Sequence, residues 1–315
     1  MAQRAFKQVD VFSPTAYLGN PLAVVLDGLG LDDAALQRFA RWTNLSETTF
    51  LLPPVDPRAD YRVRIFTPAG ELPFAGHPTL GSCHSWLEAG GQSRDPQTVV
   101  QECAAGLVRI RRSDVAGRLA FAAPPLKQRE PEPGLLAQIT AALGLDPAQI
   151  RAAQVLENGP VWFSLLLDSP ETVLAVQPRA GDLLALQAHV GLAARYAESD
   201  ALGGAPPLIA RANREAKAFG QRGKPGEGNV AAFVPDLEVR ALIAADTLYE
   251  DPVTGSLNAG LAQWLIAQGH MPATYRASQG VCIGRAGQVH IERDADGQVW
   301  VGGDTVTCID GHVGL

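Results

Sequence analysis

The sequence predicts an α+β fold, rich in β-structure and divided into two pseudo-symmetric domains. Three observations support this prediction: the chain has 315 residues, its strand-like segments follow one another as hairpins, and one motif occurs twice. At about 150 residues per domain, the length corresponds to two domains. Consecutive hairpins do not suit a doubly wound parallel sheet, in which a helix follows each strand.

A proline-rich stretch marks the expected domain boundary. Residues 124–133 contain four prolines and several charges, which favour an extended connector over a helix or a strand ladder. We therefore expect a first domain at residues 1–123, a linker at 124–133 and a second domain at 134–315. The last strand of the chain is free to return to the first domain.

Periodicity predicts the elements of each domain. In the first, strands are expected at residues 8–12, 22–26, 48–52, 61–66, 107–111 and 118–122, and helices from an Asp32 or Asp33 cap to Asn44 and at 78–88. In the second, helices are expected near 134–143, 182–189 and 257–268, and strands near 161–167, 229–234, 289–292 and 299–301.

Composition excludes several classes of protein. Hydrophobic residues make up 46% of the chain and charged residues 19%, which excludes a disordered protein. The net charge is −7 without a cluster of Lys and Arg, so no nucleic-acid partner is expected. No apolar run approaches the ~20 residues that cross a bilayer, and the chain starts without a signal-peptide pattern. We expect a cytoplasmic protein with no membrane partner.

The repeated motif is the most informative feature of the sequence. Glu71-Leu-Pro-Phe-Ala-Gly-His-Pro-Thr-Leu-Gly81 matches Glu250-Asp-Pro-Val-Thr-Gly-Ser-Leu-Asn-Ala-Gly260, with glutamate, proline and both glycines in common. We interpret this as a duplicated domain, the alternative being a coincidence of helix-start residues. Each copy has Pro-x-x-Gly followed by a helix that is apolar nearly all round, which is typical of a buried helix.

The two helix starts predict an anion site. The glycines of the repeat, Gly76 and Gly255, permit tight backbone turns just before His77 and Ser256. Two helix N-termini that face each other across a domain interface would offer unpaired N–H groups and two positive dipole ends. A substrate carboxylate is a suitable occupant of such a site.

Four polar residues are candidates for chemistry. Glu47 starts a buried strand, where desolvation would raise its pKa for acid–base work, unless it is an exposed loop residue. His77 would have its pKa lowered by the helix start, or would simply precede Pro78. Ser256 is either an N-cap or a ligand to the substrate. Asp251 replaces Leu72 of the first copy, and its alternative is a surface loop.

Other motifs carry no assignment. Residues 226–231 fit a dinucleotide pattern, G-x-G-x-x-A, but follow Lys-Pro and not an apolar strand, so a loop is favoured and no nicotinamide cofactor is expected. The four cysteines lie far apart and no histidines occur at ligand spacing, so no metal site is expected. The histidines left without a role are His84, His189, His270, His290 and His312.

Several segments, in order along the chain, carry a family resemblance. They are Val9-Asp-Val-Phe12, Gly19-Asn-Pro-Leu-Ala-Val24, Leu45-Ser-Glu-Thr48, both copies of the repeat, Ser278-Gln-Gly280 and Val301-Gly-Gly303. With them the chain resembles the PhzF-like proteins of phenazine biosynthesis. Residues 212–227, a charged and Gly-rich insert, depart from the family pattern.

The resemblance implies a diaminopimelate-epimerase-like fold, with each domain a sheet wrapped around a central helix and the site between the domains. It implies an isomerase without cofactor or metal, which forms a homodimer. The residue matching Glu47 would move a proton between carbons. His77 and Asp251 would hold or relay protons, and the substrate would bind at Ser256, Gly76, Gly255 and Asn20. Two-thiol racemisation is disfavoured, because Ala75 and Asp251 stand near the places of the cysteines used by racemases of this fold.

The leading hypothesis is therefore an isomerase that shifts a proton within a small carboxylic acid, with Glu47 as the shuttle. The alternative is a non-catalytic protein that binds or senses small acids on the same scaffold. The identity of the acid does not follow from the sequence.

Overall fold

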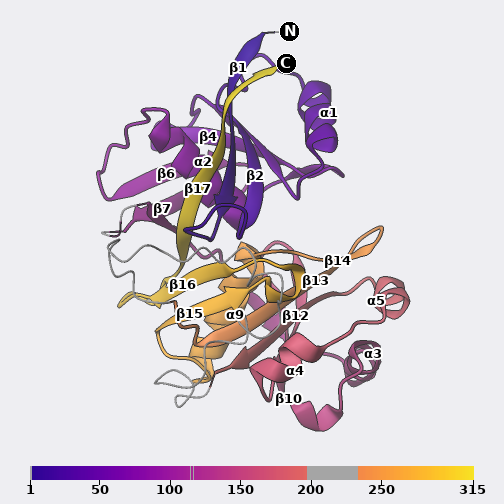
Figure 1. The fold of residues 1–315 in the computed structure, drawn as a ribbon. Coiled ribbons are helices and arrows are strands. Elements are labelled where there is room, and N and C mark those ends of the chain that lie inside the picture. The colour runs from indigo at the N-terminus through magenta and orange to yellow at the C-terminus, as the bar shows by residue number, and fades with distance from the viewer. Residues whose placement is uncertain (1, 114, 116, 197–232) are drawn as a thin grey trace, which may run out of the picture.

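The computed structural model describes residues 2–113, 115, 117–196 and 233–315. The strands form one continuous hydrogen-bonded sheet that curves around two central helices, one in each half of the molecule (Figure 1). The dinucleotide-like motif at 226–231 and the insert at 212–227 lie outside the described residues. Among the described helices, none is long and apolar enough to cross a membrane.

The N-terminal half contains eight strands and two helices among its described residues. They are β1 (Gln3–Val11), β2 (Asn20–Val25), α1 (Asp33–Thr43), β3 (Thr48–Leu52), β4 (Tyr61–Phe66), β5 (Glu71–Leu72), α2 (Gly76–Glu88), β6 (Thr98–Cys103), β7 (Gly106–Arg112) and β8 (Arg118–Ala122). The Asp32 side chain caps α1 by accepting from the Ala35 N–H at 2.8 Å, as the sequence predicts.

The C-terminal half is assembled from the same kinds of element. Its helices and strands are β9 (Lys127–Arg129), α3 (Pro133–Leu143), β10 (Ile150–Glu157), β11 (Val161–Leu167), α4 (Pro170–Ala175), α5 (Ala180–Leu186), β12 (His189–Arg195), β13 (Leu237–Ala244), β14 (Leu248–Glu250), α9 (Gly255–Ala267), β15 (Thr274–Gln279), β16 (Gly287–Arg293) and β17 (Val299–Gly314). Short 3₁₀ turns lie at Pro147–Gln149 and Val281–Ile283.

The strand pairings of the first half recur in the second. β2 and β3 are parallel, β3 and β4 antiparallel, and β4 and β6 parallel. In the same order, β11 and β12 are parallel, β12 and β13 antiparallel, and β13 and β15 parallel. The repeated motif begins in β5 and β14 and ends in α2 and α9, so both copies occupy equivalent places. This is the topology that a duplicated domain predicts.

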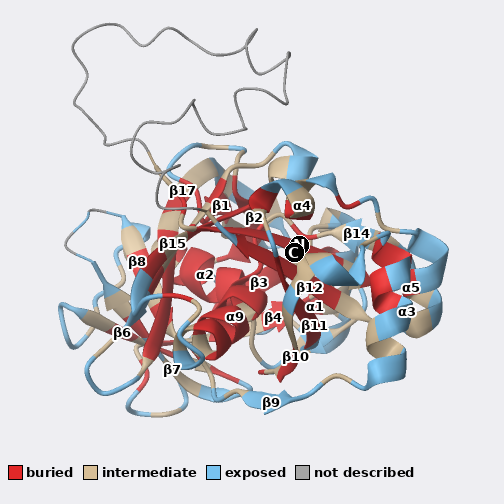
Figure 2. Cartoon of the chain, turned by 90° about the horizontal axis from the view of Figure 1, so that it is seen from below, coloured by how far each residue is buried: buried red, intermediate tan, exposed pale blue. Residues whose placement is uncertain are grey.

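The two central helices are buried, as expected from their apolar sequences. Both lie inside the curved sheets in the view of Figure 2. In α2, Leu80 and Cys83 are fully buried, and in α9 the same holds for Leu261, Trp264 and Leu265. A helix with no polar face can only be accommodated in this way. In both helices the first residues line the cavity between the halves.

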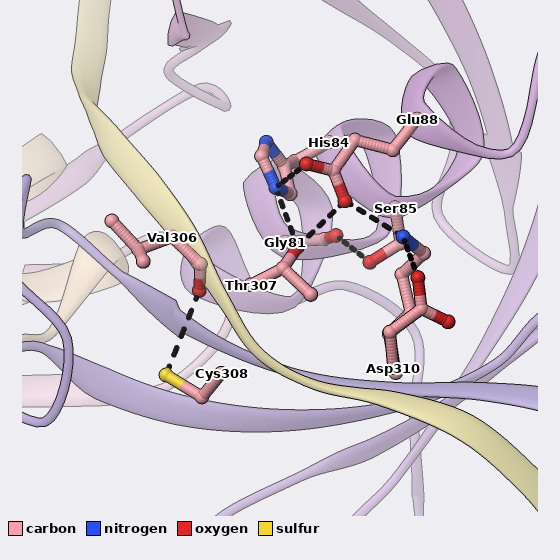
Figure 3. A network of polar contacts seen from close by, with 9 residues as sticks. Gly81, His84, Ser85, Glu88, Val306, Thr307, Cys308 and Asp310 are labelled. Atoms are coloured by element: carbon pink, nitrogen blue, oxygen red, sulfur yellow. Dashed lines mark hydrogen bonds and ion pairs between the residues drawn. The ribbon is translucent and has the colours of Figure 1, made fainter.

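The last strand joins the two halves. β17 pairs first with β16 and β8, and then runs antiparallel to β1 to the end of the chain. A side-chain network fastens this return (Figure 3). Lys7 Nζ donates to Glu88 of α2 at 2.8 Å and to Asp310 of β17 at 3.1 Å, and Thr307 Oγ1 donates to Glu88 at 2.6 Å.

Lys7→Met is expected to lower the free energy of unfolding by about 1–2 kcal/mol, because it removes two charge-assisted hydrogen bonds from a buried amine. Lys127→Met is the matched control, since Lys127 pairs with Glu157 at 2.9 Å but its side chain is 81% exposed. Urea denaturation of both variants checks this. An equal effect at the two positions would contradict a special role of the network.

Two sequence predictions need correction, and a third lies mostly outside the described residues. The linker is expected to contain no strand, but Lys127–Arg129, between its prolines, forms β9 and pairs with β10. The helix expected at 182–189 ends at Leu186, because Gln187 adopts a left-handed conformation, and His189 begins β12 instead. The strand expected near 229–234 lies mostly outside the described residues, and the described strand begins at Leu237.

Candidate active site

A cavity of about 450 Å³ lies where the two halves meet. From the N-terminal half it is lined by the end of β5, the segment that follows it and the start of α2. From the C-terminal half it is lined by the equivalent segments, between β14 and the start of α9. Its polar lining residues are Ser46, Glu47, Thr67, His77, His189, Asp251, Thr254 and Ser256. Its apolar wall is formed mainly by Leu72, Phe74, Pro160, Trp162, Ile243 and Tyr249.

The two central helices touch at their first residues. A Cβ atom on Gly76 would lie 2.9 Å from the Cα of Gly255, and one on Gly255 would lie 2.8 Å from the Cα of Gly76. Neither N-cap residue, Ala75 or Thr254, accepts a hydrogen bond from its helix through its side chain. The first-turn N–H groups of both helices therefore remain available, and two dipole ends point to one place. This geometry favours a carboxylate.

Glu47 and His77 form a buried pair in the cavity. Glu47 Oε2 lies 3.3 Å from His77 Nε2, and their side chains are 14% and 6% exposed. Burial, together with the charge of Asp251, raises the pKa of Glu47 to about 8. Burial lowers the pKa of His77 to about 3. At neutral pH the His77 imidazole is therefore neutral. Glu47 is populated in both its protonated and its ionised form, which suits proton transfer.

Asp251 is held by neighbours from both halves. One carboxylate oxygen accepts from Asn20 Nδ2 at 3.1 Å, and the other accepts from the Thr254 hydroxyl. Burial raises the pKa of Asp251. Since Asp251 also raises the pKa of Glu47, the two carboxyl groups act on each other electrostatically.

Asn20 lies behind the cavity and does not line it. Its side chain is fully buried, donates to the Val253 carbonyl at 3.0 Å and lies 3.4 Å from His77 Nδ1. The two hydrogens of this amide are donated to Asp251 and to the Val253 carbonyl, so the amide fixes the segment before α9. The geometry therefore favours a positioning role for Asn20 over the substrate contact expected from the resemblance.

Ser256 is oriented by the wall of the cavity. Its Oγ accepts from Trp162 Nε1 at 3.2 Å, and its carbonyl accepts from Asn158 Nδ2 at 2.8 Å. Because the indole N–H occupies a lone pair of the hydroxyl, the Ser256 O–H is free to donate to a ligand. Ser256 thus adds a donor to the two helix N-termini.

A larger cavity of about 610 Å³ lies elsewhere between the halves, lined by several arginines. Several of its charges are paired within the protein, Arg118 with Asp304 at 3.0 Å and Arg111 with Asp294 at 2.8 Å, and none of the site residues expected from the sequence lines it. The cavity at the helix N-termini is the better candidate.

The structure thus brings Glu47, His77, Asp251, Ser256, Gly76 and Gly255 to one cavity and places Asn20 behind it. Sequence reasoning missed His189, Trp162 and Tyr249, which also line the cavity. Trp162 and His189 lie before the second copy of the repeated motif, where the sequences of the two halves do not align. His189 is identified as a site residue only by strand pairing, which is a property of the folded chain.

Comparison with known proteins agrees with the fold. A solved structure of a PhzF family phenazine biosynthesis protein from Bacillus anthracis superposes with a TM-score of 0.76, at 18% identity and over 100% of both chains. Antisense-enhancing sequence 1 of Schizosaccharomyces pombe is 31% identical, and an uncharacterized isomerase of Mesorhizobium japonicum is 34% identical, each over 99% of both chains. A trans-2,3-dihydro-3-hydroxyanthranilate isomerase of Pseudomonas aeruginosa is 35% identical over 54% of this chain and 59% of its own.

Fold and site first define a class: an α+β protein of two pseudo-symmetric halves, with buried acid–base groups where the helix N-termini meet. The chain belongs to the family described as phenazine biosynthesis-like protein (PhzC-PhzF), whose match spans residues 9–311. The resemblance and the α+β fold class expected from the sequence are confirmed, and so is the class of isomerases at the level of the family.

Proposed function

We propose that this protein is an isomerase that shifts a proton between carbons of a small carboxylic acid, by general acid–base catalysis in the cavity between its halves. The observation that carries the proposal is Glu47, a carboxyl group with 14% of its side chain exposed, placed beside two uncapped helix N-termini. A carboxyl with a pKa near neutrality is suited to both taking and returning a proton.

The N-termini of α2 and α9, with the Ser256 hydroxyl, would bind the substrate carboxylate. Removal of a proton from carbon next to a conjugated acid leaves negative charge on the substrate, and fixed N–H donors in a water-poor site stabilise that charge. Binding the carboxylate at one end also fixes the distance from the reacting carbons to Glu47.

The remaining residues would orient the reaction. His77 stays neutral because burial lowers its pKa to about 3, so at 3.3 Å it contacts Glu47 without neutralising it. Asp251, fixed by Asn20 and Thr254, retains lone pairs for an amino or hydroxyl group of the substrate. The apolar wall around Phe74 and Ile243 would contact the carbon skeleton.

The relatives support this choice of reaction. One of them acts, by its name, as an isomerase of trans-2,3-dihydro-3-hydroxyanthranilate, a small acid with an amino and a hydroxyl group. The carboxylate of such a compound would bind at the helix N-termini, and its amino or hydroxyl group would bind to Asp251. Whether this chain forms the homodimer expected from the resemblance stays a prediction.

The test is to incubate the protein with trans-2,3-dihydro-3-hydroxyanthranilate in D₂O and to follow the compound by ¹H NMR. We expect isomerisation with uptake of solvent deuterium at carbon. Binding without any exchange, measured by thermal shift, would instead support a non-catalytic binding protein. If the compound neither binds nor exchanges, the proposed substrate class is wrong.

A further inference from the structure

The pseudo-symmetry of the molecule identifies a counterpart of Glu47. In the first half, the repeated motif begins at Glu71, which is paired with Phe66 of β4. Phe66 in turn is paired with Thr48, the first residue of β3. Glu47 is the residue immediately before this strand position.

The same series of strand pairs in the second half leads to a histidine. The motif begins there at Glu250, which is paired with Leu242 of β13. Leu242 is paired with Val190 of β12, and the residue before Val190 is His189. Strand register therefore makes His189 the structural equivalent of Glu47, although the two differ in chemistry and the sequence repeat does not extend to them.

His189 also occupies the same cavity. It lines the wall together with Glu47, and its ring lies 5.7 Å from that of Trp162, the residue that orients Ser256. Its Nδ1 atom is buried without a hydrogen-bond partner among the described residues. His189 thus lines, from the C-terminal half, the cavity that Glu47 lines from the N-terminal half.

We propose that His189 is a second proton-transfer group of this site, which acts on the substrate from the C-terminal half while Glu47 acts from the N-terminal half. The inference rests on the proposed isomerase function and deepens it. It replaces a single shuttle by two groups, one from each half of the molecule.

The chemistry balances without a further reactant. His189 removes a proton from one carbon, and the electron pair of that C–H bond moves through the conjugated carbons. The carbon at the other end takes the proton of the Glu47 carboxylic acid and forms a new C–H bond. Glu47 is then ionised and the imidazole is protonated, and exchange of one proton with water at each group restores the starting state.

The protonation states at neutral pH fit these roles. Burial lowers the pKa of His189, which keeps the imidazole neutral and able to accept a proton. Burial and Asp251 raise the pKa of Glu47 to about 8, which keeps most of it protonated at pH 7. The titratable groups that face Glu47 are His77 from α2, Asp251 before α9 and Tyr249 from β14.

The wild-type protein offers the first test, with trans-2,3-dihydro-3-hydroxyanthranilate as the probe. If Glu47 must start protonated, kcat/KM falls as the pH rises through about 8, the pKa of Glu47. If Glu47 is the only shuttle, it must start ionised, and kcat/KM rises through the same pH. A rising profile would overturn the role of His189 and leave the proposed isomerase intact.

The second test is His189→Asn, with His189→Gln as a variant of different length. We expect kcat to fall about 100-fold or more, with KM changed less than about threefold. His290→Asn is the matched control, because His290 is partly buried but does not line this cavity. Full activity of folded His189 variants would overturn the inference, whereas a wild-type protein without any exchange would overturn the proposed function itself.

Discussion

Glu47→Gln is expected to abolish isomerisation while it preserves ligand binding. Glutamine keeps the shape of the side chain but neither takes nor gives the proton, so we expect the rate to fall about 10³-fold or more. Formation of the isomer, with solvent deuterium at the carbon that Glu47 protonates, should disappear when trans-2,3-dihydro-3-hydroxyanthranilate is followed by NMR, and thermal shift should still detect binding. Retained isomerisation in the variant would rule out Glu47 as a proton-transfer group.

The same substitution should make the protein more stable at alkaline pH. Burial and Asp251 raise the pKa of Glu47 from 4.5 to about 8 in the folded state, so the folded protein holds a proton that the unfolded chain releases above pH 4.5. Stability from this group is therefore full below pH 4.5 and is lost as the pH rises through 8. Glu47→Gln does not undergo this loss. Its Tm should exceed that of the wild type by a margin that grows between pH 5 and 8.

Glu238→Gln separates the effect on catalysis from the effect on stability. Glu238 is also buried, and burial raises its pKa to about 7, but it does not line the cavity. We expect this variant to show a similar gain in Tm with rising pH and full isomerase activity. Loss of activity in both variants would show that replacement of a buried carboxyl group in general, and not loss of proton transfer at Glu47, explains the result.

Gly255→Ala is expected to have the second large effect. The new methyl group would lie 2.8 Å from the Cα of Gly76 and 3.3 Å from the backbone nitrogen of His77. Since its neighbours are backbone atoms, the two helices must separate. Overpacking of this kind lowers the free energy of unfolding by about 1–3 kcal/mol. Separated N-termini would also misplace the carboxylate site, and we expect kcat/KM to fall about 100-fold.

Gly134→Ala is the matched control for this variant. Gly134 also lies in the first turn of a helix, α3, but a Cβ atom there meets nothing within 4 Å. We expect unchanged activity and equal or slightly higher stability, because alanine favours the helix. Chemical denaturation and initial rates measure both quantities. Wild-type activity in Gly255→Ala would contradict the contact between the helix N-termini as the basis of the site.

Much of the site follows from local sequence. Glu47, His77, Asp251 and Ser256 each stand beside a helix start or a strand start that the pattern of residues predicts. These are local features, since capping, tight turns and apolar periodicity act within a few residues. The helix boundaries of α2 and α9 agree with the prediction to within two residues for the same reason.

Other features depend on packing between distant segments. Asn20 stands in a turn motif, yet its buried amide holds Asp251, 231 positions further along the chain. His189 has no partner at any diagnostic spacing, and it enters the cavity because β12 pairs with β11 and β13. Pairings of this kind are set by which apolar faces bury each other, and a local pattern does not specify them.

Local sequence patterns predicted the α+β fold class, the internal repeat and the residues that begin the two central helices. Periodicity and turn chemistry are short-range, so one chain suffices to show them. Long-range packing is needed to show that the two helix starts touch, that Asn20 supports the site from behind, and that His189 lines the same cavity as Glu47. A cavity is formed by long-range contacts, and their geometry exists only once the sheet has closed around both central helices.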